Sequence, residues 1–167
     1  MKKLLLVVVS ALSLNIAQAA VFAESASQSH KDSVYGKLGF SRGGLAIAGE
    51  FERNVNRTYS LGAILHIQPK DDTAGAAGLT AIGGYVGMHI FKRSWDFYVK
   101  PGFGILMADS GSNKETALGP QFNMGVKFQY SKDIAFGMER STFHGWLASD
   151  FKGMITDVVM ATFQYGL

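Results

Sequence analysis

Glu139, Ser141 and His144 lie close together in the sequence and carry the side chains of a hydrolase site. In such a site a histidine activates a serine nucleophile, and a carboxylate orients the histidine. The same residues could instead be hydrogen-bonding groups at the rim of a folded domain, and we favour this interpretation. The outcome depends on whether the three side chains share one face of the element that carries them.

His66, His89 and Glu50 are the residues that could most readily be taken for metal ligands. Metal sites usually show short, characteristic ligand spacings, and these three residues are far apart in the sequence. We therefore expect no metal and no cofactor, and we interpret the histidines as part of a hydrogen-bonded interior.

The elements that would position these residues are indicated by an alternation of apolar and polar side chains. Trp95, Phe97 and Val99, for example, alternate with polar residues, and a period of two indicates a strand with one apolar face. Phe91 departs from the alternation of its segment, so we expect a bulge or an early turn there. Eight strands are expected in all, over about residues 34–41, 45–53, 58–68, 79–91, 95–107, 118–130, 134–141 and 154–167.

The N-terminus has the features of a signal peptide for Sec-type export. Lys2 and Lys3 precede an apolar run over 4–16, and an Ala-x-Ala cleavage site follows at 17–19, with a second candidate ending at residue 23. The expected organisation is a signal peptide over 1–19, a short flexible leader over 20–33 and a β-domain over 34–167.

Charge and composition narrow the class of protein. Without Lys2 and Lys3, 14 basic residues stand against 13 acidic ones, so the net charge of +1 gives no reason to expect nucleic-acid binding. Only 17% of the residues are charged, which is low for a soluble domain. After the signal peptide no apolar run approaches the roughly 18 residues of a spanning helix. A transmembrane β-barrel and a secreted, lipocalin-like, ligand-binding barrel are the two remaining architectures.

Two patterns favour the transmembrane barrel, whose apolar face points outward. Short connections at 54–57, 92–94 and 131–133 alternate with longer ones at 69–78, 108–117 and 142–152, as in membrane barrels. Aromatic residues gather beside the short connections, as in the girdle at a membrane interface. The expected girdle comprises Phe51, Tyr59, Trp95, Phe97, Phe128, Tyr130, Phe136, Phe163 and Tyr165.

The polar face would then line the interior. Eight strands leave an interior just wide enough for side chains, so we expect a plugged lumen rather than a diffusion pore. An ion or proton path through the same residues is the alternative. The expected lumenal network comprises Lys37, Glu50, Glu52, His66, His89, Asp96, Lys100, Lys127 and Glu139. Arg140 breaks the outward apolar pattern, and we expect it near the outer rim, paired with lipopolysaccharide phosphate or placed on a bulge.

The sequence as a whole resembles the small eight-stranded outer-membrane barrels of the OmpA transmembrane-domain and OmpX/Ail type. Phe163, Tyr165 and Leu167 resemble the C-terminal assembly signal of such proteins. The resemblance implies an integral outer-membrane protein, not an enzyme, with a structural or surface-interaction role in adhesion or envelope integrity. It further implies a monomer that contacts outer-membrane lipid, lipopolysaccharide, the barrel-assembly machinery, periplasmic chaperones and an unknown extracellular ligand at its longer loops.

A lipid A-modifying hydrolase is the alternative function. The group around Ser141 is loosely similar to the site of the outer-membrane lipid A deacylase, in which a His-x-Ser pair faces lipid and the glutamate follows. Here the order is reversed, and Glu139 and Ser141 would face the lumen. No catalytic role is therefore assigned from this similarity.

Overall fold

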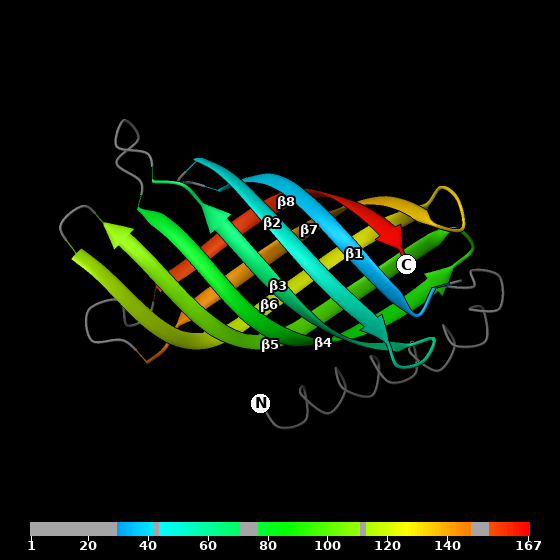
Figure 1. Cartoon of the computed structure of the whole chain (residues 1–167), viewed down its shortest axis with the longest axis horizontal. Helices are drawn as coiled ribbons and strands as arrows, with labels where there is room; N and C mark the ends of the chain where they lie inside the picture. Colours follow the sequence, from blue (N-terminus) through cyan, green and yellow to red (C-terminus); the bar gives the residue numbers. More distant parts are fainter. Residues whose placement is uncertain (1–29, 42–43, 71–76, 111–112, 148–153) are drawn as a thin grey trace, which may run out of the picture.

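A computed structural model describes residues 30–41, 44–70, 77–110, 113–147 and 154–167 of the chain, which form a closed antiparallel β-barrel. The strands are β1 (Asp32–Ser41), β2 (Gly44–Asn54), β3 (Tyr59–Gln68), β4 (Gly78–Lys92), β5 (Trp95–Ser110), β6 (Asn113–Gln129), β7 (Ile134–Gly145) and β8 (Met154–Gly166). Each strand pairs with the next in an up-and-down order (Figure 1). No helix among the described residues is long and apolar enough to cross a membrane. The expected signal peptide, and the leader up to residue 29, lie outside the described residues.

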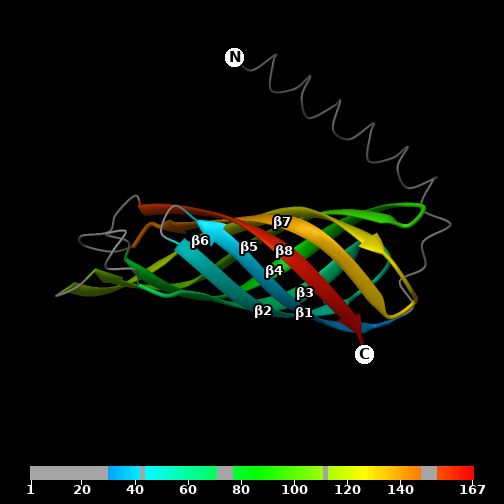
Figure 2. The ribbon, with the colours of Figure 1, turned by 90° about the horizontal axis from the view of Figure 1, so that it is seen from above.

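The barrel closes because the last strand pairs with the first. The β1–β8 register runs from Ser33 opposite Gly166 to Ser41 opposite Val158, so neither strand is left as an open edge (Figure 2). The start of β1, the end of β8 and the short β2–β3, β4–β5 and β6–β7 connections all lie at one end, which we call the turn end (Figure 1). The opposite end is the loop end. The expected all-β, eight-stranded antiparallel barrel is confirmed.

Side chains are distributed in the reverse of the arrangement found in soluble proteins. Apolar side chains such as Leu38 and Phe97 are 53% and 47% exposed on the outside, whereas Lys100 and Glu52 are fully buried inside. An apolar exterior around a polar interior is the pattern of a transmembrane barrel. The secreted lipocalin-like alternative requires an apolar interior and does not fit this arrangement.

Two of the loops expected at the loop end are shorter than the sequence indicates. The loop expected over 108–117 is largely a hairpin, because β5 continues to Ser110 and pairs there with Asn113 of β6. The loop expected over 142–152 begins later, because β7 continues to Gly145, and its residues 148–152 lie outside the described part of the chain. The expected strand ends were defined by the lipid-facing apolar side chains. Backbone pairing continues beyond these side chains, so the strands are longer than expected.

The bulge or early turn expected at Phe91 is wrong. The β4–β5 register passes through Phe91 opposite Asp96 without interruption. The Phe91 side chain points inward, is 6% exposed and stacks on the His89 ring, with centroids 5.8 Å apart and planes 10° apart. Phe91 breaks the apolar-out pattern because it fills the lumen at the turn end.

Candidate functional site

The inward positions of the strands bring eight ionisable side chains together inside the barrel. Each is buried, with at most 5% of its surface exposed. They come from six of the strands, so the network crosses the lumen rather than following one wall. Its members are Lys37, Glu50, Glu52, His89, Asp96, Lys100, Lys127 and Glu139.

Lys100 is the centre of this network. Its Nζ lies 2.5 Å from Glu50 Oε1 and 2.7 Å from Glu52 Oε2. The same ammonium lies 4.5 Å from the ring centroids of Tyr35 and Tyr98, close enough for cation–π attraction. A buried lysine is tolerated here because carboxylates and aromatic faces surround its charge.

The remaining charges extend the network across the lumen. Lys37 of β1 pairs with Glu50 of β2 and, from its Nζ, with Glu139 Oε1 of β7 at 2.6 Å. Lys127 Nζ lies 3.1 Å from Asp96 Oδ2. Direct ion pairs therefore join side chains of neighbouring strands and, from β1 to β7, side chains of strands that are two apart in the barrel.

His89 supplies the positive charge that balances the network. Among the eight members, four carboxylates face three lysines, so the network is neutral only when the His89 imidazole carries a positive charge. Its Nδ1 lies 2.9 Å from Asp96 Oδ2 and its Nε2 lies 3.6 Å from Glu52 Oε1. This position between two carboxylates suits an imidazolium.

Three tyrosines complete the network and were missed in the sequence analysis. Tyr85 donates to Glu50 Oε1 at 2.6 Å, and Tyr35 donates to Glu52 Oε1 at 2.7 Å. Tyr98 donates to Glu139 Oε2 at 3.0 Å. The alternation already placed all three on the inward face, so parity alone could have identified them.

His66, by contrast, does not join the charged network. It lies nearer the loop end, opposite Ala48 on one side and Ala81 on the other, and its ring centroid is 4.9 Å from that of Phe143. The side chain is fully buried, and neither ring nitrogen has a hydrogen-bond partner among the described residues. His66 therefore occupies an apolar section of the lumen.

Replacing His66 by leucine is expected to raise the free energy of unfolding by about 1 kcal/mol, because it removes two unpaired polar atoms from an apolar site. His89→Leu is the matched control and is expected to lower the free energy of unfolding. The His89 ring is hydrogen-bonded to Asp96 through Nδ1 and, at 3.0 Å, to Ser60 Oγ through Nε2. Urea titration of the folded barrel in lipid vesicles measures both. Equal losses in the two variants would contradict the assignment.

The hydrolase residues do not assemble into a site. Ser141 is fully buried in the lumen and donates to Glu139 Oε1 at 2.9 Å, and Glu139 is engaged by Lys37. His144 lies at an outward position of β7, so Ser141 and His144 are on opposite faces of the sheet. A histidine on the other face cannot activate this serine.

The prediction that Arg140 lies near the outer rim is wrong. Arg140 faces outward opposite Met124, which stands midway along the outward apolar residues of β6. An arginine at the midplane of a bilayer costs about 2–4 kcal/mol, against about 0–1 near an interface. The β7 register is regular there, so a bulge does not explain its position.

The nine expected girdle residues all face outward, each at least 40% exposed. Four of them, Trp95, Phe128, Phe136 and Phe163, stand opposite one another in a single row across β5 to β8 near the turn end. Their rings meet in two pairs, with centroid distances of 5.1 Å for Trp95–Phe128 and 5.4 Å for Phe136–Phe163. An aromatic row of this kind suits a membrane–water interface.

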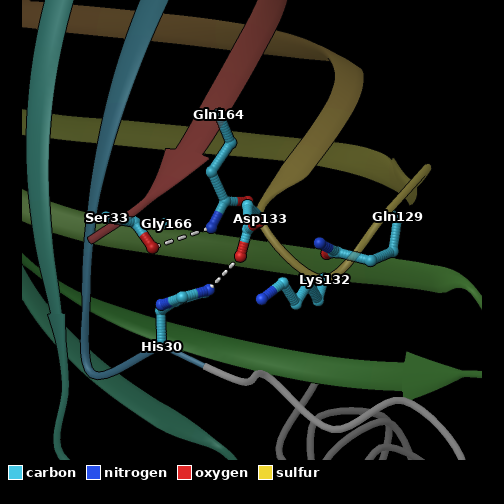
Figure 3. Close-up of a pocket in the computed structure, with 7 residues that line it drawn as sticks. All are labelled: His30, Ser33, Gln129, Lys132, Asp133, Gln164 and Gly166. Carbon is cyan, nitrogen blue, oxygen red and sulfur yellow. Dashed lines mark hydrogen bonds and ion pairs between the residues drawn. The ribbon is translucent and has the colours of Figure 1, made fainter.

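A small polar cavity lies at the turn end, between the residues before β1, the β6–β7 turn and the end of β8 (Figure 3). His30 Nε2 lies 2.6 Å from Asp133 Oδ1 in the β6–β7 turn, and His30 Nδ1 lies 3.1 Å from the carbonyl oxygen of Leu167. Gln164 donates to Ser33 Oγ at 2.9 Å across the β1–β8 seam. These contacts tie the residues before β1 to the end of β8 and hold the closing strands together.

The closed strand order, the outward apolar belt and the polar lumen define a small transmembrane β-barrel. No family model matches the sequence, and no curated protein matches it.

Solved structures with the same fold are nevertheless found. Neisserial surface protein A is similar with a TM-score of 0.64 and 11% identity, over 81% of this chain and 94% of that one. The N-terminal β-barrel domain of Pseudomonas aeruginosa OprF is similar with a TM-score of 0.60 and 10% identity, over 80% and 96%. A transmembrane β-barrel designed de novo has a TM-score of 0.51 and 15% identity, over 81% and 94%. The resemblance to small eight-stranded membrane barrels is thus confirmed at the level of the fold.

Proposed function

We propose that the protein is an integral outer-membrane barrel of a Gram-negative bacterium with a structural or surface-interaction role and a lumen closed by side chains. The observation that carries this proposal is the ion-pair network centred on Lys100, surrounded by an apolar exterior. The expected Sec-type export and the similarity to outer-membrane barrels support the location.

The closed lumen follows from how the network is held. Lys37 joins Glu50 and Glu139 across the lumen, and Lys100 joins Glu50 and Glu52. A hydrated ion entering this section would have to separate pairs that are desolvated and hydrogen-bonded, which costs several kcal/mol for each pair. Side chains fill the interior of an eight-stranded barrel, and a conducting pore is not expected.

The external partners are those of a membrane barrel. The apolar belt contacts lipid, the aromatic row lies at the periplasmic interface, and the loop end faces outward toward lipopolysaccharide and an extracellular ligand. During biogenesis, Phe163, Tyr165 and Leu167 act as the signal recognised by the assembly machinery after periplasmic chaperones deliver the chain. The loop-end contact surface is the β5–β6 hairpin together with the β3–β4 and β7–β8 connections.

Membrane fractionation and planar-bilayer recording test this function. We expect the protein in the outer-membrane fraction, a band that migrates differently in boiled and unboiled gel samples, and little or no single-channel conductance. Recovery in the soluble periplasmic fraction would overturn the location. Stable channels of uniform conductance would overturn the closed lumen.

A further inference from the structure

A polar cluster interrupts the lipid-facing surface where β7 meets β8. Arg140 Nη2 lies 2.9 Å from Asp157 Oδ2, and Thr142 donates to Asp157 Oδ1 at 2.6 Å. The Arg140 and Asp157 side chains are 57% and 48% exposed on the outside of the barrel. We call Arg140, Thr142 and Asp157 the β7–β8 polar cluster.

The cluster lies beside the apolar belt of β6, whereas on β7 itself the next outward residues toward the loop end, Thr142 and His144, are polar. Arg140 stands opposite Met124 of β6 and Val159 of β8. On β6, outward apolar residues continue toward the loop end as far as Leu118 and toward the turn end as far as Phe128. The neighbouring strand is therefore apolar both above and below the height of Arg140.

Lipid alone is a poor neighbour for this cluster. A guanidinium has five N–H donors, and among the described residues Arg140 is hydrogen-bonded to Asp157 alone, through one nitrogen. Acyl chains offer no acceptor for the remaining donors or for the outward carboxylate. Ionisable side chains at membrane depth usually face protein or a water-filled cavity. Protein is thus the expected cover for this surface.

The composition of the cluster indicates which kind of protein covers it. Arg140 and Asp157 carry opposite charges, and Thr142 adds a hydroxyl, so the cluster is self-complementary and has no net charge. An interface with two-fold symmetry presents the same patch on both sides and requires such self-complementarity. An anionic lipid headgroup would favour a patch with excess positive charge, which Asp157 removes.

An apolar groove lies beside the cluster and offers a second place at which another protein could pack. It is lined on the outside by Met88, Val99, Met124, Met138 and, at its edge, Arg140. Methionine side chains are flexible and adapt to the side chains that pack on them. The groove and the cluster are contiguous, because Arg140 belongs to both.

We propose that this surface is the interface of a homodimer in the membrane, with two copies related by a two-fold axis along the membrane normal. Arg140 of each copy then donates to Asp157 of both copies, and outward side chains of one copy pack in the groove of the other. This inference replaces the monomer expected from the sequence, and it requires the membrane fold but not the proposed biological role.

Disulfide cross-linking of the full chain in lipid vesicles tests the interface, since the sequence contains no cysteine. Val159→Cys places a thiol beside the cluster, and Leu65→Cys on β3 is the matched control, because both positions are outward and about half exposed, at 53% and 43%. We expect a cross-linked dimer on mild oxidation of Val159→Cys and little from Leu65→Cys. Equal cross-linking at both positions, or none at either, would overturn the proposal.

Charge reversal tests the chemistry of the interface. Arg140→Asp and Asp157→Arg are each expected to raise the dimer dissociation constant about tenfold or more, measured by energy transfer between labelled copies at increasing dilution in lipid. The double exchange restores opposite charges and is expected to restore dimerisation. The gel shift on boiling confirms that each variant is folded. Folded variants that dimerise like the parent chain, or a monomeric parent that retains bound lipid or another protein at this face, would overturn the proposal.

Discussion

Replacing Lys100 by methionine is expected to lower the free energy of unfolding by about 3–5 kcal/mol, the range for breaking a buried ion pair by removing one partner. Methionine fills similar volume but leaves Glu50 and Glu52 without the cation that lies 2.5 Å and 2.7 Å from them. The carboxylates cannot turn toward water, because both are buried in the lumen. The loss is therefore mainly electrostatic and not a packing defect.

Urea titration in lipid vesicles measures this loss, and two further variants identify its origin. Lys114→Met is the matched control: the Lys114 side chain is 81% exposed and lies 3.5 Å from Asp109, so a change of about 0–1 kcal/mol is expected. The double variant Lys100→Met/Glu52→Gln removes a negative charge as well and is expected to recover part of the stability. Similar losses for Lys100→Met and Lys114→Met would contradict the central role of Lys100.

The sequence was sufficient to predict the strands and their two faces. A period of two assigns each residue to one face without knowledge of its neighbours, and this local rule placed Lys37 and Leu38 on opposite sides of β1. Eight such segments, with connections of the right lengths, then indicated a closed barrel. The prediction succeeded because a membrane barrel imposes the same rule on every strand.

Depth in the membrane and contacts across the lumen could not be obtained in this way. Sliding a strand by two residues preserves its faces but changes every neighbour, so the alternation does not determine register. Arg140 was expected at the rim for this reason, and only its position opposite Met124 locates it at mid-height. Likewise, parity placed His66 inside but could not show that its neighbours are Ala48 and Ala81.

The candidate hydrolase group shows a different limit. Proximity in sequence suggested that Ser141 and His144 could meet, but an odd separation along a strand puts two residues on opposite faces. These residues could form a hydrolase site only if the strand ended before His144. The apolar residues indicated such an early end, at residue 141. The structure extends β7 to Gly145, and that extension separates the two side chains.

Replacing Gly39 by alanine is expected to lower the free energy of unfolding by about 3 kcal/mol, at the upper end of the range for overpacking. An added Cβ would overlap the carbonyl oxygen of Val159 and lie 2.7 Å from the Cα of Met160. Both are main-chain atoms of β8, which the paired strands on either side prevent from moving. The methyl group would therefore strain the seam at which the barrel closes.

Gly36→Ala, three residues earlier on the same strand, is the matched control for this seam. Gly36 faces outward, and an added Cβ meets nothing within 4 Å. Alanine there is expected to raise the free energy of unfolding by about 0.5–1 kcal/mol, because glycine loses more backbone freedom on folding. Urea titration and the gel shift on boiling measure both variants. A loss for Gly36→Ala as large as that for Gly39→Ala would show that close contact at the β1–β8 seam is not the reason for glycine at position 39.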